Sequence, residues 1–234
     1  MANIRIEDIE RQIFAQRDEK TALKLQSKFQ TSFHIAGLSQ KARQEFLRKI
    51  QKDFPPGDDE FLWLNLLHDL WDSPYFECKL IALQLLFIQD ERVDSNIWGT
   101  LDHWTDDIDT WILADWLGHV RAIANNKMPY LIMRLAVWLQ SLNPMRRRSA
   151  LVSLVHVSPE NGACKLILRP QEIIAFVEPV IGDQDHNVSP AIAWILNLIK
   201  ERSPSLFADY YKNVQTQLDR NVHKLLFQSL SDIK

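Results

Sequence analysis

The stretch that decides the fold is MPYLIMRLAVWLQSLNPMRRRSALVSLVHVS, residues 128–158. It holds two segments of helical length on either side of the dipeptide Asn143-Pro144. An asparagine side chain can accept a hydrogen bond from a free amide of the first helical turn, and proline suits the first helical position because its missing N–H needs no partner there. The stretch therefore predicts a pair of helices, 128–141 and 144–158, that meet at Asn143.

The same pattern, a capping residue followed by proline, recurs along the chain. Ser73-Pro74, Ser189-Pro190 and Ser203-Pro204 each predict a helix start, and we expect Asp109 to start another helix without a proline. The resulting pairs are 59–72 with 74–90, 94–104 with 109–121, 128–141 with 144–158, 169–181 with 189–201, and 204–218 with 221–233. Their first members recur about every 35 to 40 residues, a period typical of stacked helix pairs of the HEAT kind.

The rest of the chain fits one helical domain. Residues 1–53 predict an N-terminal cap of three helices, 3–15, 20–31 and 39–53, and residues 54–234 hold about five helix pairs. Six glycines and ten prolines offer little turn chemistry for β-hairpins, and no linker divides the chain. We expect an all-α fold, a right-handed α-solenoid forming a single curved domain over residues 1–234 with a concave binding surface.

Composition limits the partners. The 234 residues are 46% apolar and carry a formal net charge of -3, which excludes attraction to nucleic acid over the whole chain. No apolar stretch is long enough for a bilayer span, and residues 1–20 are charged without an apolar block, so we expect a cytoplasmic protein without a membrane segment. Cys78 and Cys164 lack paired spacing and are expected to be buried thiols rather than a disulfide.

The charge is unevenly divided. Residues 1–115 hold 13 basic and 21 acidic side chains, whereas residues 116–234 hold 14 basic and nine acidic ones. The C-terminal half could therefore hold a duplex. Four aspartates, Asp102, Asp106, Asp107 and Asp109, crowd the approach to the next helix and would repel phosphate unless they face away from it.

Several side chains point away from the expected core of the second helices. Trp111 lies almost opposite the apolar stripe of its helix, and Asp115 follows one turn later on the same side. Trp111 could simply cover a neighbouring helix while Asp115 accepts from an amide or an arginine. Trp194 lies at the margin of the apolar stripe of its own helix and could be packed or half-exposed.

Three consecutive arginines, Arg146, Arg147 and Arg148, occupy the first turns of a helix, where the helix dipole favours anions instead. A negative partner is therefore expected. It could be a carboxylate such as Asp115 on the preceding unit, or a phosphate, which suits both the arginine fork and the helix N-terminus.

Three short motifs follow in order on successive second helices: Trp111-Ile-Leu-Ala-Asp115, Arg147-Arg148-Ser149-Ala150 and Ala191-Ile192-Ala193-Trp194. They are similar to the Trp-x-x-x-Asp, Arg-Arg-x-Ala and Ile-Gly-Trp motifs of the AlkD-like DNA alkylation repair glycosylases, which are HEAT-like solenoids. The segments 32–49 and 66–86 also resemble that family. The chain departs from it at Met145, where the family often has tryptophan, and at Asn197, where it has a basic residue.

This resemblance implies a DNA glycosylase that removes cationic alkylated purines, such as 3-methyladenine and 7-methylguanine, by hydrolysis of the N-glycosidic bond. Asp115 would be the catalytic carboxylate, Trp111 and Trp194 would contact the lesion-bearing nucleotide, and Arg148 with Arg147 would bind the DNA phosphates. The lesion need not be flipped into a pocket. The expected partner is double-stranded DNA with alkylated bases, bound by a monomer without metal or organic cofactor.

A second class of function remains open from the sequence. A non-catalytic HEAT-like module could bind DNA structure or a protein along the same concave face, and an inactive relative of the enzyme would lie between the two.

Overall fold

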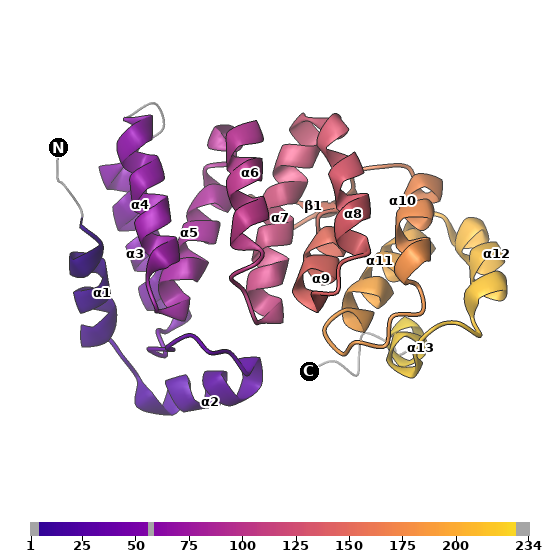
Figure 1. The fold of residues 1–234 in the computed structure, drawn as a ribbon, viewed down its shortest axis with the longest axis horizontal. Helices are drawn as coiled ribbons and strands as arrows, with labels where there is room; N and C mark the ends of the chain where they lie inside the picture. Colours follow the sequence, from indigo (N-terminus) through magenta and orange to yellow (C-terminus); the bar gives the residue numbers. More distant parts are fainter. Residues whose placement is uncertain (1–4, 56–58, 228–234) are drawn as a thin grey trace.

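The computed structural model describes residues 5–55 and 59–227. Figure 1 shows the helices standing side by side in chain order, from the indigo N-terminal end to the yellow C-terminal end. The first helices of the pairs are α4 (Glu60–Asp72), α6 (Ser95–Trp104), α8 (Leu135–Leu139), α10 (Pro170–Val177) and α12 (Pro204–Val214). The second helices are α5 (Phe76–Ile88), α7 (Trp111–Lys127), α9 (Pro144–Val152), α11 (Ser189–Arg202) and α13 (Arg220–Phe227).

The second helices form a continuous row. α5 contacts α7, α7 contacts α9, α9 contacts α11 and α11 contacts α13, while α5, α7, α9 and α11 each also pack against the first helix of their pair. α5 is apolar on nearly all sides, and every residue from Phe76 to Phe87 is buried, as expected for a helix enclosed by neighbours. The predicted all-α architecture of stacked helix pairs is confirmed in its main lines.

The N-terminal cap also follows the prediction. It consists of α1 (Ile6–Ala15), α2 (Glu19–Phe29) and α3 (Gln40–Asp53), and the first residues of the predicted helix 3–15 lie outside the described part. α2 lies across the lower edge of the stack in Figure 1. The segment after α2 is held to α5, because the buried Glu77 carboxylate accepts from the backbone amides of Ala36, Gly37 and Leu38 at 3.1, 2.8 and 3.3 Å.

The predicted helix starts are confirmed in part. Asn143 caps α9 by accepting from the Met145 amide at 2.8 Å, and α11 and α12 begin at Ser189 and Pro204. Ser73-Pro74 is wrong as a start, because Ser73 ends α4 and α5 begins only at Phe76.

Asp109 is also wrong as a cap. α7 begins after Thr110, and the Asp109 carboxylate instead accepts from the Thr31 hydroxyl and the Ser32 amide, both at 2.6 Å. This aspartate therefore ties the chain after α2 to the chain before α7.

Several predicted helices are shorter than expected, including 169–181 and 204–218, where α10 ends at Val177 and α12 at Val214. Residues 128–141 form a 3-10 helix, η2 (Pro129–Arg134), followed by α8. α9 ends at Val152, and the expected helical residues that follow form strand β1 (Val155–Val157), which pairs antiparallel with β2 (Cys164–Leu166). Two further 3-10 turns, η1 (Asp90–Arg92) and η3 (Glu178–Val180), follow α5 and α10, and the last residues of the predicted helix 221–233 lie outside the described part.

The hairpin has a clear local cause. Val155 and Val157 are β-branched, and Asn161-Gly162 supplies the turn, with Gly162 at a φ of 71°. Ser158 and Ala163 close the loop through a 3.0 Å hydrogen bond from the Ser158 amide to the Ala163 carbonyl.

Both cysteines are free thiols. Cys78 is buried in α5, where burial raises its pKa to about 12, and Cys164 is half-buried in β2 rather than fully buried as expected.

Candidate functional site

Trp111 and Asp115 lie on the first turns of α7, as the sequence predicts. The Trp111 ring is half-buried and meets the Phe29 ring of α2 edge-on, with centroids 5.9 Å apart. Asp115 follows one turn along α7, and its side chain is 21% exposed. Both residues can therefore reach a ligand at the surface.

Arg148 holds Asp115 in a two-pronged ion pair. Its Nε donates to Asp115 Oδ1 and its Nη2 to Asp115 Oδ2, both at 2.7 Å, while Nη1 donates to the Asn187 carbonyl. The guanidinium also lies over the Trp111 ring, with Cζ 5.3 Å from the centroid. The sequence leaves either a carboxylate or a phosphate open as the partner of this arginine. In the structure its partner is the Asp115 carboxylate.

The backbones of α7 and α9 approach each other closely at Gly118, three residues after Asp115 on α7. A Cβ on Gly118 would lie 2.6 Å from the Val152 Cβ and 2.9 Å from the Ser149 carbonyl, so only glycine fits there. One turn further, the fully buried Arg121 of α7 donates to Ser149 Oγ at 2.7 Å. These contacts fix the position of Asp115 relative to Arg148.

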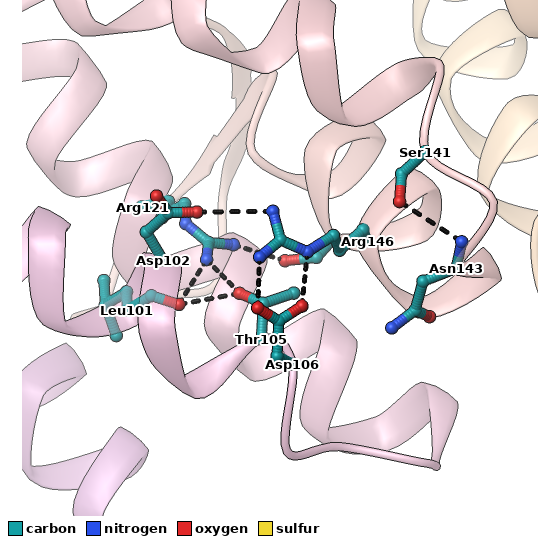
Figure 2. Close-up of polar contacts among 9 residues, drawn as sticks. Leu101, Asp102, Thr105, Asp106, Arg121, Ser141, Asn143 and Arg146 are labelled. Carbon is teal, nitrogen blue, oxygen red and sulfur yellow. Dashed lines mark hydrogen bonds and ion pairs between the residues drawn. The ribbon is translucent and has the colours of Figure 1, made fainter.

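The other two arginines also have carboxylate partners. Arg146 donates to both oxygens of Asp106, at 2.7 and 2.6 Å, and lies 3.5 Å from Asp102 (Figure 2). Arg147 donates from Nε to Asp183 at 2.6 Å and from Nη1 to the Ser141 carbonyl at 2.8 Å. Arg147 therefore holds the loop that precedes α11.

The acidic cluster before α7 is largely paired within the fold. The hydrogen bonds from Arg146 lower the pKa of Asp106 below its usual range. Asp107 accepts from Trp71 Nε1 at 3.0 Å, and Asp109 accepts from the chain after α2. The expected repulsion of phosphate is correspondingly reduced, because Asp102 and Asp106 share one guanidinium.

A basic cleft opens on one side of the Asp115–Arg148 pair. It encloses about 400 Å³ between the end of α2 and the N-terminal ends of α7 and α11, and is lined by Lys28, Phe29, Gln30, Trp111, Arg148, His186, Asn187 and Pro190. Helix N-termini carry partial positive charge, which adds to the charges of Lys28 and Arg148. Sequence reasoning missed Lys28, because nothing local indicates that α2 folds back to α7.

An aromatic cleft opens on the other side. It encloses about 340 Å³ between α5, α7 and the β-hairpin, and is lined by Phe87, Ile112, Asp115, Trp116, His119, Val157, Ser158, Pro159 and Gly162. Among the residues that the structure describes, no lysine or arginine lines it. Ile112 and Trp116 are half-buried here, although both lie on the apolar stripe of α7 that the sequence predicts to pack against the core.

His119 joins the aromatic cleft to Trp194. The His119 ring meets Trp116 and Trp194 edge-on, with centroids 6.0 and 6.3 Å apart. Burial lowers the pKa of His119, the nearby Arg148 cation lowers it further, and Asp115 partly opposes both. Trp194 is half-buried behind this histidine and does not line the basic cleft.

The structure thus brings Trp111, Asp115 and Arg148 together and places Trp194 next to them through His119. Within residues 5–55 and 59–227, no group of three or more His, Cys, Asp or Glu side chains is arranged to hold a metal ion. In the same ranges, none of the helices combines the length and apolar character that crossing a bilayer needs.

The sequence matches the family described as DNA alkylation repair enzyme over residues 9–224, nearly the whole chain. The chain belongs to the DNA alkylation repair enzyme family. The resemblance expected from the three motifs is thereby confirmed at the level of the family. No curated protein sequence matches the chain.

Solved structures share the fold of this DNA alkylation repair protein. A predicted DNA alkylation repair enzyme from Enterococcus faecalis superposes with a TM-score of 0.76 at 14% identity, covering 93% of this chain and 98% of that one. AlkD2 from Streptococcus mutans gives a TM-score of 0.61 at 17% identity, over 89% and 96% of the two chains. The smu.31 protein from Streptococcus mutans UA159 gives 0.57 at 16% identity, over 80% and 98%.

Proposed function

We propose that this DNA alkylation repair protein is a glycosylase that releases cationic alkylated purines, of the 3-methyladenine and 7-methylguanine type, from duplex DNA. The observation that carries the proposal is the Asp115 carboxylate, held by two hydrogen bonds from Arg148 beside Trp111 and partly open to solvent.

The chemistry requires little beyond such a carboxylate. A purine alkylated on a ring nitrogen is cationic and can depart without a general acid, while positive charge develops on the anomeric carbon of the sugar. A two-pronged arginine uses only two of the four acceptor sites of a carboxylate. The other two can stabilise the sugar cation and orient the attacking water, and one fixed group of this kind contributes about 3 to 4 kcal/mol to lowering the barrier. Trp111 and Trp194 would add cation–π attraction.

Phosphate binding is proposed for the basic cleft. Arg148 uses three of its five N–H groups inside the protein, so two remain for a DNA phosphate without loss of the Asp115 pair. Arg147 makes four hydrogen bonds within the protein and lines neither cleft, so its proposed role is weaker than that of Arg148. Lys28 is a further candidate on the opposite wall of the cleft.

The test is release of the alkylated base from methylated duplex DNA. Asp115→Asn should lower the single-turnover rate by about 10²- to 10³-fold, because the amide cannot stabilise the sugar cation. Asp106→Asn is the matched control, since it breaks a similar two-pronged arginine–aspartate pair, with Arg146 on α9, and neither residue lines either cleft. It should cost stability and leave base release intact. Wild-type protein that releases no base from any cationic lesion would overturn the proposal.

One observation favours the non-catalytic alternative. All three arginines of α9 already have carboxylate partners, as they would in a module whose charges only hold the fold. Such a module would bind duplex DNA or a protein and release no base, so the same assay separates the two functions.

A further inference from the structure

The Trp111 ring contacts two cationic side chains that come from different elements. Arg148 of α9 places its Cζ 5.3 Å from the centroid of the ring, and Lys28 of α2 places its Nζ 6.0 Å from it. The electron-rich face of an indole attracts cations at such distances. All three residues line the basic cleft. One ring therefore contacts both the lysine and the arginine of that cleft.

The two cations differ in how firmly they are held. Arg148 is fixed by its hydrogen bonds to Asp115 and to the Asn187 carbonyl, whatever Trp111 contributes. Lys28 is exposed, and its ammonium lies near aromatic rings, that of Phe29 at 5.8 Å and that of Trp111. A lysine side chain has a flexible four-carbon stem, so its position depends on the contacts of its ammonium.

Trp111 also fixes the backbone from which Lys28 extends. The neighbouring Phe29 is buried, meets the Trp111 ring edge-on at 5.9 Å and lies 5.3 Å from the Phe76 ring of α5. Gln30 then ends α2 in the left-handed region, at a φ of 49°. The end of α2 is therefore docked on the same indole that contacts Arg148.

The charges of this arrangement suit a phosphate group. Within the described part of the chain, no aspartate or glutamate lines the basic cleft. Lys28 and Arg148 repel each other, and the ring between their elements offsets part of that repulsion through its attraction for both. The ammonium has three donors and Arg148 has two N–H groups left, so one phosphate can accept from both residues.

We propose that Trp111 is the positioning residue of a phosphate clamp, in which it holds Lys28 and Arg148 so that both bind one DNA phosphate. This role is additional to the nucleotide contact proposed for Trp111. It rests on the proposed function only in taking the occupant of the basic cleft to be the DNA backbone. Because a phosphate contact carries no information about the base, the clamp should act on undamaged duplex as well.

The experiment measures the affinity of the full chain for a short undamaged duplex, by fluorescence anisotropy at a series of salt concentrations. Trp111→Leu should reduce the slope of log affinity against log salt by about one and weaken binding at 0.1 M salt by up to about tenfold, because Lys28 loses its position. Trp111→Phe should restore most of both, since an aromatic face returns. A folded Trp111→Leu protein with the wild-type slope would overturn the proposal.

A double-mutant cycle separates positioning from direct contact. Lys28→Ala should reproduce the loss seen in Trp111→Leu, and the double variant should bind at most about twofold more weakly than either single variant, because the ring acts through the lysine. Additive losses would contradict the positioning role. A purely structural role of Trp111 would lower stability without this dependence on Lys28.

Trp116→Leu is the matched control. Trp116 is also a half-buried tryptophan of α7, but it lines the aromatic cleft and not the basic one. Its replacement should leave the salt slope unchanged. A reduction equal to that of Trp111→Leu would contradict a specific role of Trp111.

The readout does not need hydrolysis. A protein that shows this coupling on undamaged duplex but releases no alkylated base would contradict the proposed glycosylase and leave the clamp standing. A protein that releases base while Trp111→Leu leaves its salt slope unchanged would do the reverse.

Discussion

His119 is a histidine that the fold keeps neutral beside a carboxylate and a guanidinium. Its Nδ1 lacks a hydrogen-bond partner within the described chain, and burial lowers its pKa. The unfolded chain takes up a proton near the ordinary histidine pKa of about 6.5, before the folded protein does. Protonation in acid therefore favours unfolding.

This linkage predicts an acid-sensitive stability. The free energy of unfolding should fall as pH drops from about 6.5 toward the lowered pKa of His119, with a slope of up to about 1.4 kcal/mol per pH unit from this one group. Urea unfolding at pH 7.5, 6.5 and 5.5 measures it, and His119→Gln should flatten the dependence. His103→Gln, at an exposed position on α6, is the control and should leave the slope unchanged. The lowered pKa of His156 adds a similar contribution that both variants retain.

At this scale the sequence predicts that Trp111, Asp115 and Arg148 lie together, but it does not predict the partners of the other arginines. Trp111, Asp115 and Arg148 share one site because the helical period brings them to one side of neighbouring helices. Periodicity could not tell which carboxylate each arginine would take, because Asp106 and Asp183 come from loops on either side of α9. Sequence spacing also could not predict that the Trp194 ring would meet the His119 ring edge-on, because this is a contact between side chains of different helices.

At the scale of elements, the crossing of α7 and α9 sets the site. Gly118 allows the two backbones to approach, and Asp115 lies one turn before it on α7. Any residue that pushes the helices apart also pulls Asp115 away from Arg148.

Gly118→Ala should therefore cost about 1 to 3 kcal/mol of stability, because the new Cβ meets the Ser149 carbonyl at 2.9 Å as well as the Val152 side chain. Base release should fall with it. Gly99→Ala is the matched control, since nothing lies within 4 Å of its Cβ, and it should stabilise α6 by about 0.4 to 1 kcal/mol. Urea unfolding measures the change in stability of both variants. Equal changes would contradict the role of the close approach of α7 and α9 at Gly118.

The element boundaries show where sequence reasoning failed. A scarcity of glycine argues against hairpins in general, yet one Asn161-Gly162 turn next to Val155-His156-Val157 is enough to make one. The apolar pattern of residues 144–158 cannot distinguish a helix from a short helix followed by a strand, since both bury Leu151, Leu154 and Val155.

At the scale of the whole molecule, the acidic N-terminal half contributes Lys28, together with Phe29, Gln30 and Trp111, to a cleft whose other lining residues belong to the basic C-terminal half. The overall charge of -3 therefore says little about the local potential at that cleft. The row of second helices brings the acidic and basic halves together at α7 and α9.

Binding to duplex DNA should weaken steeply and linearly on a plot of log affinity against log salt concentration, because phosphate contacts release counterions. Lys28→Ala should reduce the slope by about one and weaken binding to all duplex sequences alike. Lys212→Ala is the control, since Lys212 pairs with Asp209 on α12 and lines neither cleft. An affinity for duplex DNA that does not change with salt concentration would contradict phosphate binding in the basic cleft.

The link from Asp109 to Thr31 and Ser32 joins parts of the chain almost eighty positions apart. Stacked helix pairs otherwise fold through contacts between neighbours, each formed at small loop-closure cost. The wall of the basic cleft depends on this link and on the packing of Phe29 against Trp111, so we expect it to close only after α3 to α6 have stacked between its two sides. Folding intermediates would then already hold the aromatic cleft, and the ability to hold phosphate would be the last property that the protein acquires.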